Sequence, residues 1–153
     1  MSESIRSQIL NNLKTTLETI SITNGYYQDI INVYDDRLDI PESFNDFPIL
    51  FIIDTDETKT IFDVDSTENN LEIIITGYLK KLNDEDNIQL RRRYLQADLE
   101  EAIMQDERRN ELAIATEVKS IKTDKGIIEP YAIFDMAINI KYYTNKKDPY
   151  IIG

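Results

Sequence analysis

The chain has 153 residues, with 17 lysine and arginine residues against 29 aspartate and glutamate residues, which gives a formal net charge of −12. It contains no cysteine and no histidine, so disulfide bonds are excluded and the usual ligands of a structural zinc ion are missing. A surface this acidic repels phosphate groups, which argues against tight or sequence-specific binding of nucleic acid.

The N-terminal part of the chain predicts an amphipathic helix followed by a strand. Ser2 or Ser4 is a candidate N-cap for the helix. The apolar residues that follow recur at helical spacing: Ile5, Ile9, Leu10, Leu13, Leu17 and Ile20. Asn24-Gly25 is expected to end this region, and a strand is predicted over Tyr27–Tyr34.

The middle of the chain predicts loops and strands. An aspartate-rich loop is predicted at residues 35–48. The apolar run Ile49–Ile53 favours a central strand covered on both faces; it is too short to span a bilayer, so no membrane partner is expected. Residues 54–70 are predicted as an acidic loop with at most a short strand at Thr60–Val64, and Leu71–Leu82 alternates as a long strand does.

The last part of the chain predicts a helix and then a hairpin. The helix begins near Asp84 or Asp86 and ends near Arg109. Two alternating strands follow, over Leu112–Ile121 and Pro130–Tyr143, with a glycine-containing turn between them.

Together these elements predict one α+β domain over residues 1–143, in the order α-β-β-(β)-β-α-β-β. The strands come in groups rather than alternating with helices, which favours a mostly antiparallel mixed sheet with the two main helices packed on one face. The tail at residues 144–153 is first basic and then apolar. We expect the tail to be flexible in the isolated chain or docked at an interface.

One short motif points to an enzyme. The strand at Ile49–Ile53 and the following Asp54-Thr55-Asp56-Glu57-Thr58 resemble the first motif of the haloacid dehalogenase-like phosphatases. That resemblance implies Asp54 as the nucleophile and Asp56 as the acid/base, with magnesium beside the phosphate. The context differs, because a helix and a strand come first and no parallel Rossmann-like sheet is predicted. We therefore predict no enzymatic activity and keep the phosphatase as the alternative.

The acidic stretch Asp54–Glu68 could also hold a divalent cation. It lacks the ligand spacing and the glycine of an EF-hand loop, and no helices flank it. A solvated acidic loop is the favoured interpretation, and no cofactor is predicted.

Two further segments are candidates for protein contacts. Arg91, Arg92 and Arg93 form a basic cluster that could meet a carboxylate-rich neighbour or could balance acidic residues of its own chain. The apolar tail and the acidic pair complete the predicted interface: Arg91, Arg92, Arg93, Asp54, Asp56, Tyr150, Ile151 and Ile152.

The order of the elements resembles the tail-terminator (tail-completion) proteins of long-tailed bacteriophages. The features that carry this resemblance are the opening helix at 5–17, the loop that closes in Phe47–Ile52, the strand Leu71–Tyr78, the helix around Leu95–Leu99 and the closing hairpin that ends in Ala137–Tyr142.

The resemblance implies a hexameric ring of this chain that caps the growing tail tube, with the tail-tube protein and a head-completion or connector protein as partners. It implies a place in the neck of the virion tail, after assembly in the host cytoplasm. DNA would only pass through the lumen, for which a non-adhesive acidic wall is suitable. The remaining alternative is an acidic protein that imitates DNA to block a host nuclease, although acidity alone indicates only solubility.

Overall fold

The computed structural model describes residues 3–30, 32–36 and 47–153, which form two helices and a six-stranded sheet. In chain order the elements are α1 (Ile5–Glu18), β1 (Asn32–Tyr34), β2 (Ile49–Ile61), β3 (Ser66–Lys80), α2 (Ile88–Met104), β4 (Ala115–Thr123), β5 (Tyr131–Asn145) and β6 (Asp148–Ile152). The predicted α+β class is confirmed.

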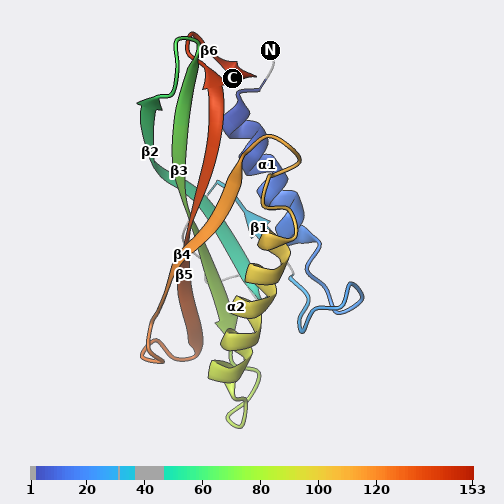
Figure 1. Ribbon diagram of the computed structural model, residues 1–153. Coiled ribbons are helices and arrows are strands. Elements are labelled where there is room, and N and C mark those ends of the chain that lie inside the picture. Colours follow the sequence, from blue (N-terminus) through green and yellow to red (C-terminus); the bar gives the residue numbers. More distant parts are fainter. Residues whose placement is uncertain (1–2, 31, 37–46) are drawn as a thin grey trace.

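The sheet is antiparallel except at one short edge. Its order is β1-β2-β3-β5-β4, with β6 also paired to β5, and only the β1–β2 pair is parallel. β3 and β5 pair along their whole lengths and form the long twisted centre of the sheet (Figure 1). Both helices lie on the same face, so the predicted layering is confirmed.

α1 forms where the apolar spacing predicts it. Ser4 caps the helix, its hydroxyl accepting a hydrogen bond from the backbone N–H of Ser7, which satisfies one of the free donors at a helix start. The inward residues Ile5, Ile9, Leu13 and Leu17 are all buried. Full burial of each such side chain contributes roughly 1.5–3 kcal/mol, so packing on the sheet holds this helix in place.

The core lies between the helices and the inward faces of β3 and β5. Paired residues of antiparallel strands share a face, so Ile73 with Ile138 and Ile75 with Met136 point inward together. At Gly77 a Cβ atom would lie 2.4 Å from the ring of Phe134. The absence of a side chain at this position is what lets the ring occupy the core.

The region predicted as an acidic loop at 54–70 is mostly strand, and that prediction was wrong. β2 continues to Ile61 and β3 begins at Ser66, so the two form one long ribbon with a tight turn. The Asp63 side chain closes the turn by accepting hydrogen bonds from the N–H groups of Asp65 and Ser66. The first of the acidic side chains that indicated a loop lie on the outer part of β2. This part of the strand is rich in threonine, which favours strand structure.

Two predicted boundaries also change. The strand expected at Tyr27–Tyr34 is only three residues long. The backbone N–H of Tyr27, which strand pairing would need, donates instead to the carboxylate of Asp98 on α2. α2 ends at Met104, five residues early, and the chain then turns through positive φ at residues 109–111. Buried Arg109 donates to the carbonyl oxygens of Ile103 and Asp106 and so satisfies the end of the helix.

The C-terminal segment forms β6, which pairs with the end of β5 through Asn145 and Thr144 with a shift in register. Its docking at an interface stays a prediction. The predicted loop at 35–48 falls mostly outside the described residues.

Candidate assembly surfaces

The sheet has one free edge on each side. On one side β1 covers only Ile49–Phe51 of β2. The rest of β2 pairs with β3 on its inner side and has no described strand on its outer side. On the other side β4 is the last strand, with β6 beyond its start. An uncovered strand edge presents backbone donors and acceptors to any strand that approaches. Both edges are therefore candidate contact surfaces.

The predicted acidic pair lies on the β2 edge. Asp54 and Asp56 are exposed, and neither forms an ion pair with a described residue. They flank a shift in register in the middle of β2 rather than the end of a parallel strand. The setting that the phosphatase motif needs is therefore absent: the strand runs past both carboxylates into an antiparallel ribbon.

The arginine cluster is mostly used within the chain. Arg91 pairs with Asp86, and Arg92 donates to Asp124 at 2.9 Å, with both members of the second pair largely buried. Arg93 is exposed and donates only to the carbonyl oxygen of Gln89 on its own helix. A role for the cluster in contacting a neighbour stays a prediction, and it rests on Arg93.

A group of exposed apolar residues gathers at one end of the sheet. The turn of the β2–β3 ribbon lies beside the connection to β6, where the N–H of Lys146 donates to the carbonyl of Asp65 at 2.7 Å, and the rings of Phe62 and Tyr143 are 4.8 Å apart. We call this surface the apolar end; it comprises Ile61, Phe62, Val64, Tyr150, Ile151 and Ile152.

Three of the six residues of the apolar end lie in the region 54–70 that was predicted as an acidic loop, and that prediction gave no reason to expect them at an interface. The tail residues were predicted to be an interface, but Ile61, Phe62 and Val64 were not. The signal was present, since three large apolar residues interrupt an otherwise acidic stretch. The opposite end of the sheet carries a smaller exposed set, Leu82, Ile127 and Ile128.

A polar cluster fixes the ribbon to α1. The carboxylate of Glu57 accepts hydrogen bonds from Arg6 of α1 and from the hydroxyl of Tyr142 of β5, and it pairs with Lys59 at 2.8 Å. Burial alone would raise the pKa of Glu57, but the hydrogen bonds from Arg6, Lys59 and Tyr142 outweigh it and lower the pKa to about 2. Glu57 therefore stays ionised and joins three elements near the apolar end.

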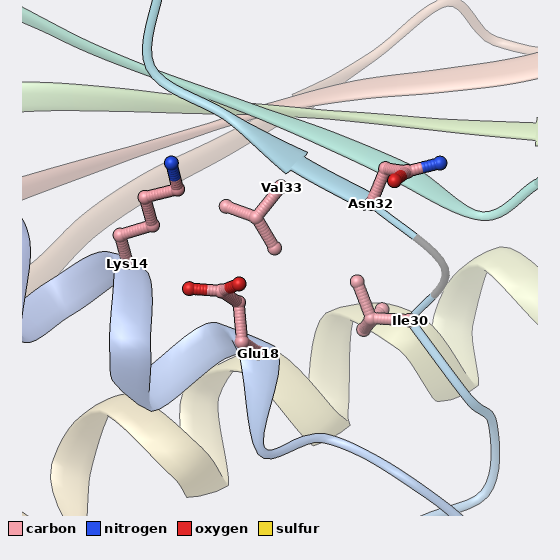
Figure 2. Close-up of a pocket in the computed structure, with 5 residues that line it drawn as sticks. All are labelled: Lys14, Glu18, Ile30, Asn32 and Val33. Atoms are coloured by element: carbon pink, nitrogen blue, oxygen red, sulfur yellow. The ribbon is translucent and has the colours of Figure 1, made fainter.

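A hollow between α1 and the β1 region is small. Figure 2 shows Lys14 and Glu18 of α1 facing Ile30, Asn32 and Val33 across it. Its volume is about 190 Å³, below the roughly 300–1,000 Å³ of small-molecule sites. Lys14 also lies 3.7 Å from the carboxylate of Asp35. The hollow gives no reason to infer a cofactor.

The described residues show neither a metal-binding cluster nor a membrane-spanning helix. No three acidic, cysteine or histidine side chains there are grouped as metal ligands would be. No described helix is long and apolar enough to cross a membrane.

The sequence matches the model of a protein family described as Bacteriophage Tail Tube Terminator Protein, over residues 1–149. The chain belongs to this family. The resemblance drawn from the order of its elements is confirmed, and the match spans every element of the structure except the end of β6. A comparison with curated proteins gives no match.

Membership of this family places the protein in the phage tail and makes it a structural component. A tail tube terminator associates with the tail tube and other virion parts. The free sheet edges and the apolar end are therefore candidate surfaces for these associations.

Proposed function

We propose that this tail tube terminator works as a ring of six copies, as the family resemblance implies, that caps the tail tube and joins it to the head connector. The observation that carries the proposal is the pair of free edges on opposite sides of one sheet. A closed ring needs two different patches on each copy, one meeting the other on the next copy. The two edges supply such a pair.

The net charge sets the conditions for ring formation. With −12 per copy, long-range repulsion opposes assembly until salt screens it or a tube end acts as a template. The acidic charge also suits a lumen through which DNA passes without binding, and assembly in the host cytoplasm fits a chain without cysteine.

The ring is tested by light scattering at increasing protein and salt concentration. We expect a monomer when the protein is dilute and salt is low, and a single larger species when salt is raised. Tail-tube protein from the same phage, polymerised with and without the terminator, should give shorter tubes of uniform length when it is present. A strict monomer that leaves tube length unchanged would overturn the proposal.

A second prediction concerns the phosphatase alternative. We expect no hydrolysis of a generic phosphate ester in the presence of magnesium, because Asp54 lies within a continuous strand. The assay is repeated with Asp54→Asn as the control. Turnover that this substitution abolishes would favour the enzyme.

A third prediction concerns the C-terminal segment. Tyr150, Ile151 and Ile152 are about half exposed in the single chain, and we expect an assembled ring on the tube to cover them. Trypsin should cut at Lys146 and Lys147 more slowly in the assembly than in the monomer, while Lys125 in the β4–β5 turn serves as the internal reference. If assembly slows cleavage at Lys125 by the same factor as cleavage at Lys146 and Lys147, the result would count against a docked tail.

A further inference from the structure

Both free edges carry a bulge, and the two bulges adjoin the same cross-strand row from opposite sides. In β2 the step from Asp54 to Glu57 spans one residue more than the facing step from Ile73 to Leu71 of β3. In β4 the step from Val118 to Ser120 likewise spans one residue more than its partner in β5.

The row is traced through the pairing of the sheet. Asp54 is opposite Ile73, Ile73 is opposite Ile138, and Ile138 is opposite Val118. Each bulge disrupts the ladder and leaves an extra residue unpaired. The β2 bulge follows this row on the side of Leu71, and the β4 bulge follows it on the side of Ile74 and Ala137. The two disruptions therefore occur in neighbouring steps of the ladder, at similar height on opposite sides of the sheet.

The two bulges carry opposite charges. The β2 bulge consists of Thr55 and Asp56, with Asp54 beside it, and neither aspartate has an ion-pair partner among the described residues. The extra residue in β4 is Lys119. Its only ion pair within the described chain is with Glu117 at 2.9 Å, and both side chains are about half exposed or more. Such a surface pair contributes at most about 1 kcal/mol, so Lys119 can exchange it for a stronger partner.

The strand directions suit a head-to-tail contact. Three antiparallel steps separate β2 from β4, so the two strands run in opposite directions. Rotation about an axis parallel to the strands preserves both direction and height. The β4 edge of one copy then meets the β2 edge of the next in antiparallel orientation, with Lys119 in the step next to the row of Asp54.

The alternative two-fold contacts are disfavoured by charge. A β2 edge paired with its own copy would bring Asp54 and Asp56 against the same carboxylates, and a β4 pair would oppose two copies of Lys119. Like charges directly opposite one another destabilise a strand pair.

From these observations we infer that the ring contact is made between the β4 bulge of one copy and the β2 bulge of the next, with Lys119 facing the acidic pair Asp54 and Asp56. The inference rests on the proposed ring and specifies the patches that close it. The bulges prevent either edge from pairing with any strand that approaches. The opposite charges then favour the pairing of a β4 edge with a β2 edge, which is the pairing that closes the ring.

Cysteine cross-linking tests the contact directly, because the chain has no cysteine of its own. We expect Asp56→Cys and Lys119→Cys to give no disulfide dimer alone under mild oxidation, and a dimer when mixed. A chain that carries both substitutions should give a ladder of oligomers that stops at the ring. Glu100→Cys, on the exposed side of α2, replaces Lys119→Cys in the control mixture and should not cross-link.

A non-covalent test uses charge alone. Lys119→Glu should raise the protein concentration needed for assembly about tenfold or more, because facing like charges cost over a kilocalorie, whereas Lys119→Arg should leave it unchanged.

The outcomes separate this contact from the ring itself. Dimers from either single variant, or equal cross-linking of the control mixture, would overturn the contact. Assembly seen by light scattering without cross-linking of the mixture would also overturn it while leaving the ring intact. A protein that stays monomeric in every condition, tube ends included, would overturn the proposed ring.

Discussion

Replacing Glu57 with alanine will lower the free energy of unfolding by about 2–3 kcal/mol. The change leaves the hydroxyl of buried Tyr142 without its acceptor and releases Arg6 and Lys59; a buried group left unsatisfied costs about 1–3 kcal/mol. Urea unfolding of wild type and variant at neutral pH measures the difference. Glu117→Ala is the matched control, because its carboxylate pairs on the open surface and should change stability by less than about 0.5 kcal/mol.

The same cluster predicts how stability depends on pH. The pKa of Glu57 is about 2 in the folded chain and about 4.3 when unfolded. A lowered pKa contributes stability that is complete above the unfolded value and is lost as the pH falls toward the folded one. We expect the difference in free energy of unfolding between wild type and Glu57→Ala to become smaller as the pH falls from about 5 to about 2. A difference that stays constant over this range would contradict the role assigned to Glu57 in the cluster.

The sequence predicts the elements that a periodic apolar pattern defines. α1 and the paired strands β3 and β5 lie where alternation places them, because their buried faces leave a regular trace of apolar residues. The extension of β2 could not be predicted in this way. Its outward residues are polar, and its inward Glu57 is satisfied by Arg6 from a distant helix and Tyr142 from a distant strand.

The candidate surfaces likewise divide into those that the apolar residues of the sequence predict and those that they do not. Tyr150, Ile151 and Ile152 were predicted because exposed apolar residues at a chain end need a partner. The bulges at Asp56 and Lys119 depend on strand register, which a single sequence does not specify. For the arginine cluster the sequence left two interpretations open, a contact with a neighbour or pairing within the chain; Arg91 pairs with nearby Asp86, whereas the partner of Arg92, Asp124, is distant in the sequence.

If the sheet edges form the ring, the two ends of the sheet point along the ring axis. The apolar end would then lie on one face of the ring and the smaller set around Leu82 on the other. The proposed role needs two unlike faces, one for the tube and one for the connector. The unequal apolar surfaces at the two ends meet this requirement.

The largest effect on assembly is therefore expected from Phe62→Asp combined with Ile151→Asp. Both side chains are more than half exposed in the single chain, so the free energy of unfolding should change little. Because each is already partly buried, covering the rest against a partner contributes roughly 0.8–1.5 kcal/mol each. The double variant should therefore bind that partner at least about tenfold more weakly.

The readouts are tube length, which reports capping, and the attachment of heads to capped tails. We expect the double variant to lose one of these two steps while it still forms rings. Leu82→Asp, at the opposite end, is the matched variant and should impair the other step. Loss of the ring itself would place the apolar end in the contact between copies, and normal capping and attachment would exclude it from any contact. Separate loss of the two steps is expected because faces that point along the ring axis meet different partners.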